Sequence, residues 1–145
     1  MSGTRVEFDD RALKEAMRTV LSLLGDPSKM YPDFSVAMQG DVFDHFRNET
    51  GPTEKWEKSR RAKLSGGSTL RDTGRLINSI LSKPNKSEAV VETDTRYASI
   101  HNFGGAISGS KQKGTMPKRE FMFLSDAVKK DMTSIAGDHI TKAWS

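Results

Sequence analysis

Four stretches of the chain carry apolar residues at the spacing of an amphipathic helix. In 9–24 these positions recur every three or four residues, until a Gly-Asp-Pro turn ends the pattern. Residues 34–46 repeat the pattern in steps of four, so we expect the first two helices to be antiparallel neighbours joined by a short turn. Further helices are predicted at 70–81 and at 125–144, the last with Ser125 as its N-cap.

Short runs that are rich in β-branched residues and bounded by turn residues predict strands. The clearest is Ala89–Thr93, and 105–123 is expected to form the two arms of a hairpin with its tip at 107–116. Thr4–Phe8 is a further candidate for an edge strand. The sequence therefore predicts an α+β fold, in which about four helices pack on a small, mostly antiparallel sheet.

Length and composition limit the number of domains. The chain has 145 residues, of which 34% are hydrophobic, so we expect one domain, 1–145, around one modest core. No apolar run approaches the roughly 20 residues of a membrane-spanning helix, and the N-terminus lacks the pattern of a secretory signal. We therefore expect folding in the cytoplasm and no membrane partner. The absence of cysteine excludes disulfides, thiolate zinc sites and cysteine nucleophiles.

The excess of positive charge lies in one segment. Gly51–Arg71 carries six basic and two acidic residues, which accounts for the whole net charge of +4. Because Trp56 and Leu64 are its large apolar residues, we expect 51–69 to be a long, basic, partly mobile loop that Trp56 pins at one end. Such a loop can neutralise DNA phosphates, with Trp56 stacked on a base, or it can become ordered against a neighbouring subunit. The composition favours the second interpretation, because no helix-turn-helix spacing is evident, and the two interpretations are compatible.

The histidines form no recognisable metal site. His45, His101 and His139 lie on different predicted elements, and none pairs with another at ligand spacing, so we expect no metal or other cofactor. Asp41 lies four residues before His45 on one predicted helix, and Asp44 lies beside them. This group is interpreted as a pairing on the helix surface.

The sequence does not contain the arrangements that are typical of enzymes. It has no Gly-x-Ser-x-Gly elbow, and its paired glycines lack the lysine and the strand-to-helix context of a phosphate loop. Catalysis would require His101 together with an acid such as Asp94 or Glu120. The sequence therefore favours a protein that is not an enzyme.

Residues 96–105 form the densest cluster of aromatic residues and glycines. In a single helical turn, Tyr97 and His101 would share a face and Gly104 would end the turn with a left-handed cap. The alternative is a structural corner, in which Tyr97 and Phe103 fill the core and His101 bonds to a backbone carbonyl.

Four sequence pieces, in this order, resemble a family of phage morphogenesis proteins. They are the aromatic helix that leads into Gly51–Trp56, then Leu70–Ile80, Tyr97–Gly104 and Met116–Ser125. The family comprises the tail completion proteins of P2-like phages and the virion morphogenesis proteins of Mu-like phages. The spacings Leu-x-x-Thr-Gly-x-Leu and Tyr-Ala-x-Ile-His-x-Phe-Gly are its most specific parts. After the tryptophan, Glu-Lys-Ser-Arg-Arg at 57–61 replaces a proline-and-leucine element of the family.

We expect the motif residues to fold the domain rather than to touch a partner. They are Leu70, Thr73, Gly74, Leu76, Tyr97, His101, Phe103, Gly104, Arg119 and Phe121. Of the residues in and near these motifs, Leu76, Ile80, Tyr97, Ile100, Phe103 and Phe121 are expected in the core.

The resemblance implies a structural protein without catalysis, located in the virion at the head–tail neck. Such a protein completes or terminates the tail so that the tail can join the DNA-filled head. It would act as a homo-oligomer, a hexameric ring around the DNA channel, in contact with tail tube and head–tail connector proteins. The alternatives are a head-side connector or stopper protein and, from the basic segment alone, a small nucleic-acid-binding protein.

In such a ring, two basic regions are the candidates for contacts with a neighbouring subunit or with DNA in the channel. One is the predicted loop, and the other is the hairpin tip, next to Lys118 and Arg119. The candidate residues are Lys55, Trp56, Lys58, Arg60, Arg61, Lys63, Lys111 and Lys113. Basic residues that face the channel would accommodate packaged DNA without reading its sequence.

Overall fold

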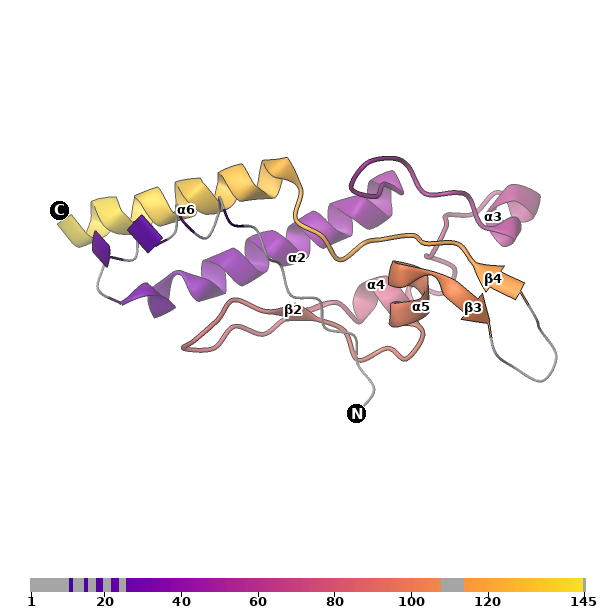
Figure 1. Cartoon of the computed structure of the whole chain (residues 1–145), viewed down its shortest axis with the longest axis horizontal. Helices are drawn as coiled ribbons and strands as arrows, with labels where there is room; N and C mark the ends of the chain where they lie inside the picture. The colour runs from indigo at the N-terminus through magenta and orange to yellow at the C-terminus, as the bar shows by residue number, and fades with distance from the viewer. Residues whose placement is uncertain are drawn as a thin grey trace. The chain divides into compact units, whose positions relative to one another are not determined.

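The computed structural model of the chain describes residues 11, 15, 18–19, 22–23, 26–107 and 114–144 (Figure 1). In chain order the elements are η1 (Pro27–Lys29), α2 (Tyr31–Asn48), α3 (Arg60–Ser65), α4 (Arg75–Asn78), β1 (Leu81–Ser82), β2 (Val91–Glu92), α5 (Ala98–Phe103), β3 (Gly105–Ile107), β4 (Gly114–Met116) and α6 (Asp126–Trp144). The predicted α+β class is confirmed, and the strands form two small antiparallel pairs, β1–β2 and β3–β4. Within the described ranges, no helix has both the length and the apolar character required to cross a bilayer.

The chain divides into two compact units. The first unit contains Val42–Leu81 and Glu92–Phe123, and the second contains Ser82–Val91 with the described residues of Glu7–Asp41 and Leu124–Ser145. Each unit has buried apolar side chains of its own. Those of the first unit are Val42, Phe46, Trp56, Ala62, Leu76, Ile80, Ala98, Phe121 and Met122, and those of the second are Met30, Phe34, Met38, Val90, Val91, Val128, Met132 and Ala136. The expectation of a single domain stays a prediction.

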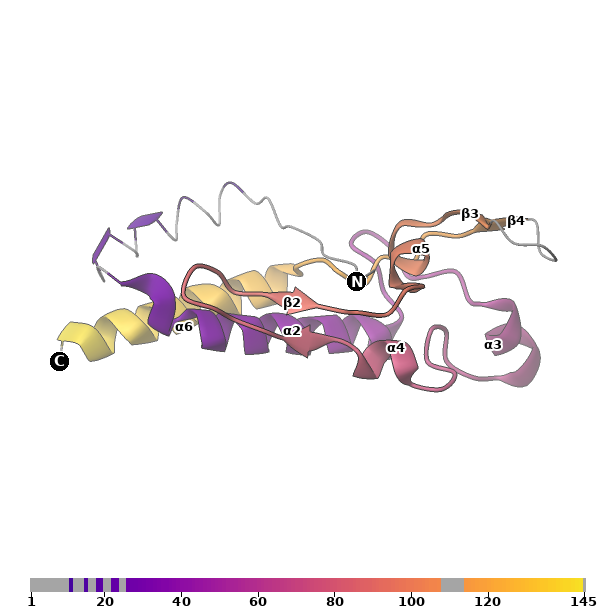
Figure 2. The same cartoon turned by 90° about the horizontal axis from the view of Figure 1, so that it is seen from below.

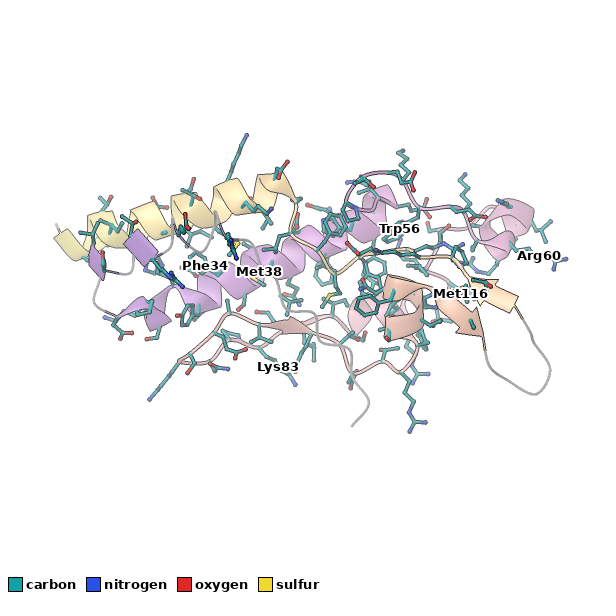
Figure 3. All side chains as sticks on the ribbon, in the orientation of Figure 1. Phe34, Met38, Trp56, Arg60, Lys83 and Met116 are labelled. Atoms are coloured by element: carbon teal, nitrogen blue, oxygen red, sulfur yellow. The ribbon has the colours of Figure 1, made fainter. Side chains whose placement is uncertain are left out.

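In the second unit, α6 runs antiparallel to the first part of α2 (Figures 1 and 2). Two polar contacts set this direction. Near the start of α2, the carboxylate of Asp33 lies 2.9 Å from Nε2 of His139, which is close to the end of α6. Ten residues into α2, the carboxylate of Asp41 reaches Ser125, at the start of α6. Between these contacts the helices bury the periodic apolar positions that predicted them, including Phe34 and Met38 (Figure 3).

Asp41 and Ser125 together cap α6. The two carboxylate oxygens of Asp41 accept from the backbone N–H of Ser125 at 3.0 Å and from its hydroxyl at 2.5 Å. The Ser125 hydroxyl in turn accepts from the N–H of Val128 at 3.1 Å, which confirms Ser125 as the N-cap. Because Asp41 and His45 are both buried, their predicted position on the helix surface is wrong.

The β1–β2 hairpin contributes Ser82–Val91 to the second unit, beside α2 in Figure 2. Its turn is closed by the side chain of Asn85, which accepts from the N–H groups of Ser87 and Glu88 at 2.7 and 3.0 Å. The N–H of Val90 donates to the hydroxyl of Ser35 on α2 at 2.9 Å. The strand predicted at Ala89–Thr93 is thus present, although the ladder is limited to Val91–Glu92.

The helix predicted at 70–81 is wrong for most of its length, because only Arg75–Asn78 is helical. Leu70 has a φ of 64° and Gly74 a φ of 75°, and positive φ angles at these two positions interrupt a right-handed helix. The apolar spacing of this stretch therefore reflects burial of Leu76 and Ile80 around a short turn of helix.

Two predictions lie wholly or partly outside the described residues. The edge strand Thr4–Phe8 is one of them. Of the helix predicted at 9–24, six residues are described and all six are helical: Arg11, Glu15, Arg18, Thr19, Ser22 and Leu23.

The hairpin predicted between 105 and 123 is confirmed in shortened form. β3 and β4 pair antiparallel, with Gly105 opposite Met116 and Ile107 opposite Gly114. The tip of this hairpin, at 108–113, with Lys111 and Lys113, lies outside the described residues.

Replacing Asp41 with alanine should lower the free energy of unfolding by about 2 kcal/mol, because the cap of α6 loses a buried charged acceptor. The matched control is Asp44→Ala on the same helix, whose exposed carboxylate lies 3.4 Å from Arg47. An exposed pair contributes less than about 1 kcal/mol. Urea denaturation measures both variants, and equal losses would contradict the capping role of Asp41.

Candidate functional site

In the first unit, the extended stretch Arg119–Met122, here called the bracing segment, holds the elements around it in place. Side chains from other parts of the first unit form hydrogen bonds with the backbone N–H and C=O groups of this segment. Nε1 of Trp56 donates to the carbonyl of Glu120 at 3.0 Å. Nδ1 of His45 donates to the carbonyl of Phe121 at 2.9 Å. Oδ1 of Asn102 accepts from the N–H groups of both Phe121 and Met122 at 3.0 Å.

Trp56 fixes the point at which the basic segment begins. After α2, the chain makes a tight turn, in which the N–H of Gly51 donates to the carbonyl of Glu54 at 2.7 Å. Trp56 then inserts its ring edge-on to Phe46, with centroids 5.6 Å apart, and is only 7% exposed (Figure 3). The prediction that Trp56 pins one end of the segment is confirmed. Its burial also corrects the expectation that it reaches a neighbouring subunit or stacks on a base.

The segment that was predicted to be a long loop contains a capped helix. The hydroxyl of Ser59 accepts from the N–H of Ala62 at 3.1 Å and so caps α3, and Gly66 ends the helix with a φ of 75°. Nη2 of Arg61 donates to the carbonyl of Ser68 at 2.6 Å. The N–H of Thr69 bonds to the carboxylate of Glu49. These contacts order the stretch, although it has few apolar residues.

An open groove of about 870 Å³ lies in this unit. Its lining comes from the approach to α3 and α3 itself, from the stretch that leads into α4, from α5, and from the chain between β4 and the bracing segment. Figure 3 labels Arg60 on α3 and Met116 on β4, which both line it. The charged lining residues are six basic ones, Lys58, Arg60, Arg61, Lys63, Arg75 and Arg119, and two acidic ones, Glu57 and Asp72.

Four of the predicted contact residues line the groove. Lys58, Arg60, Arg61 and Lys63 line it, whereas Lys55 is exposed outside it. The groove also brings together residues of three motifs that lie far apart in the sequence. They are Leu70, Thr73, Gly74 and Leu76, then Tyr97 and His101, and finally Arg119. Their roles in binding stay predictions.

Arg119 connects the bracing segment to the basic segment. Its Nε donates to the carbonyl of Glu57 at 2.7 Å, and its backbone N–H donates to the carbonyl of His101 at 2.8 Å. Burial lowers the pKa of Arg119, and the nearby charge of Glu57 acts in the opposite direction. Because the ordinary pKa of arginine is so high, the guanidinium stays charged and places a fixed cation in the groove.

His101 supplies a largely neutral imidazole to the groove. Burial lowers its pKa first, and the charge of Arg119 lowers it further. The ring packs edge-on to Tyr97, with centroids 5.7 Å apart, and its buried Nδ1 has no hydrogen-bond partner among the described residues. The expectation that His101 bonds to a carbonyl through its side chain is therefore wrong. The carboxylate of Glu120, which was its candidate catalytic partner, pairs instead with Lys118 at 3.1 Å.

Two of the predicted core residues are at the surface. Leu76, Ile80 and Phe121 are buried as predicted, but Tyr97 is 36% exposed and Phe103 is 52% exposed. The helical turn predicted here is confirmed by α5. Gly104 follows it with φ 70° and ψ −176°, an extended conformation at positive φ in place of the predicted left-handed cap.

Sequence reasoning missed Asn102, which is buried and accepts from the N–H groups of Phe121 and Met122. Asparagine is a poor helix former, so its place within a short helix was a signal that its side chain bonds to backbone elsewhere. It also missed Arg75 and Thr115 in the groove lining, for which the sequence carries no comparable signal.

The described residues hold no cluster of three histidine or carboxylate side chains suited to a metal ion. His45 is instead stacked on Phe123, with ring centroids 3.7 Å apart, and His139 pairs with Asp33. The groove itself combines an excess of cationic side chains with apolar lining residues.

Comparisons with known proteins cover most of the chain. The sequence profile of the phage virion morphogenesis family matches residues 8–141. A curated relative, the Mu-like prophage FluMu G protein 2 of Haemophilus influenzae, is 35% identical over 102 residues, which make up 70% of this chain and 70% of the relative. No solved structure matches the chain.

Replacing Gly104 with alanine should destabilise the first unit by at least about 2 kcal/mol, because few other residues adopt its backbone conformation. A Cβ there would also lie 2.8 Å from the backbone nitrogen of Lys118 and 3.0 Å from the carbonyl of Met116. The matched control is Gly114→Ala in the same hairpin, where a Cβ meets nothing within 4 Å. Urea denaturation compares the two variants. A Gly104→Ala protein as stable as the control would contradict this account of the hairpin.

Proposed function

Because the chain belongs to the phage virion morphogenesis family, we propose that it completes the head-proximal end of the phage tail and so enables the tail to join the head. The observation that carries this proposal is the match of the family profile to residues 8–141, nearly the whole chain. Membership confirms the resemblance that the sequence motifs indicated, and it establishes a structural role in virion morphogenesis.

In this proposal the protein acts at the head–tail neck as a closed homo-oligomer, a ring of six around the DNA channel. Tail tube and head–tail connector proteins are its neighbours. The role requires no catalytic step and no cofactor, since a ring works by presenting fixed surfaces. The basic groove supports the proposal, because a protein that joins other components needs a surface of distinctive charge.

A position on the head side, as a connector or stopper, is the second candidate. Family membership alone also permits it, because the family is described by virion morphogenesis and not by a position in the virion. The two positions differ in which half of the particle is defective when the protein is missing.

A stop codon early in the gene tests the proposal directly. Electron microscopy of the lysate should reveal filled heads beside unattached tails, and the tails should have an abnormal head-proximal end. Supplying the intact gene from a plasmid should restore joined particles. Intact infectious virions without complementation would refute a role in joining, and lysates with only empty heads would favour the head-side position.

A further inference from the structure

We propose that the basic groove is a docking site for an acidic peptide segment of another virion protein. The segment would be extended and would carry an aliphatic or aromatic side chain between carboxylates. This inference rests on the proposed function, since it names the kind of partner that one surface of the neck protein takes. It distinguishes a protein segment from packaged DNA, which the basic segment of the sequence also suggested as a partner.

The positive charge of the groove lining favours an anionic partner. Lys58, Arg60, Lys63 and Arg75 line the groove and form no ion pair with any described carboxylate. Arg61 is different, because it lies 3.6 Å from Asp72. Several cations without a local counter-ion attract a partner that brings carboxylates or phosphates.

The apolar residues of the groove lining favour a peptide over DNA. Leu70, Met116 and Pro117 line the groove and are half-buried, and the buried Leu76 is a further apolar lining residue. A row of phosphates gains nothing from apolar atoms, whereas an aliphatic or aromatic side chain gains free energy by covering them. His101, whose pKa is lowered by burial and by the charge of Arg119, also lines the groove and adds a polar ring to it.

Hydrogen bonds hold the segments that form the groove, so a partner would not have to order them on binding. Ser59 caps α3, Arg61 bonds to the carbonyl of Ser68, and Arg119 bonds to the carbonyl of Glu57. Binding to a preorganised surface avoids much of the entropy loss that otherwise weakens association.

Charge balance points to a different protein rather than to a second copy of this chain. Outside Gly51–Arg71, the basic and acidic residues of the chain are equal in number. A second copy therefore offers no excess of carboxylates that matches the groove.

The test is a photo-cross-linking experiment in infected cells. The full chain, supplied from a plasmid to the stop-codon phage, carries benzoylphenylalanine in place of Thr115, which is exposed and lines the groove. After irradiation, mass spectrometry identifies what is attached to the probe. The expected product is a segment of another virion protein with carboxylates on both sides of an apolar residue.

Two charge variants that change the net charge equally complete the design. Arg60→Glu with Lys63→Glu reverses two cations of the groove, and Lys55→Glu with Arg96→Glu reverses two exposed cations outside its lining. The groove variant should reduce the yield of adduct by about tenfold and the control variant by less than about twofold, because contact charges act at short range. Circular dichroism confirms that both variants fold.

Several results would overturn the inference. These are an adduct with DNA, an adduct with a second copy of the chain, an adduct with a segment that has no carboxylates, and no adduct above the level of the same probe at Lys55. An equal loss of yield in both charge variants would also overturn it. The tail phenotype of the stop-codon phage is scored separately, so a failed docking site and a failed neck assignment can be told apart.

Discussion

The first unit depends on one constraint: the backbone N–H and C=O groups of the bracing segment need hydrogen-bond partners, although the segment is not part of a sheet. Buried peptide groups that lack partners destabilise a fold, and here side chains supply the partners in place of strands. Trp56 and His45 each contribute one hydrogen bond, Asn102 contributes two, and the carbonyl of His101 accepts from the N–H of Arg119. The segment thereby joins the end of α2, the start of the basic segment and α5 in one network.

The groove and its charge follow from this network. Because Trp56 bonds to the carbonyl of Glu120 and Arg119 bonds to the carbonyl of Glu57, the cations from Lys58 to Lys63 are placed in one groove with residues of α5 and β4. A flexible loop of the same composition would offer its charges in no fixed pattern. The structure thus gives a virion morphogenesis protein a preorganised cationic surface.

The sequence predicted those parts of the fold that local patterns determine. Periodic apolar positions predicted α2 and α6, Ser125 was recognised as a cap, and β-branched residues and glycines predicted the strands and the β3–β4 hairpin. Prediction from the sequence failed where contacts between distant residues, or unusual backbone angles, override the local pattern. Leu70 at positive φ breaks the expected helix, and Ser59, Thr69 and Arg61 order the expected loop through bonds to partners that no periodicity reveals. Half of the predicted contact residues nevertheless line the groove, because charge is visible in composition.

Amide hydrogen exchange, followed by NMR, tests most directly whether the bracing segment holds the first unit together. The N–H groups of Arg119, Phe121 and Met122 should exchange as slowly as those in the buried part of α2 around Phe46, since all of them open only when the unit unfolds. Replacing Asn102 with alanine should accelerate the exchange of the backbone N–H groups of Phe121 and Met122. The indole N–H of Trp56, which donates to the carbonyl of Glu120, should exchange faster with them. If these amides exchange at the rate of an unstructured peptide while α2 stays protected, the bracing segment does not organise the unit.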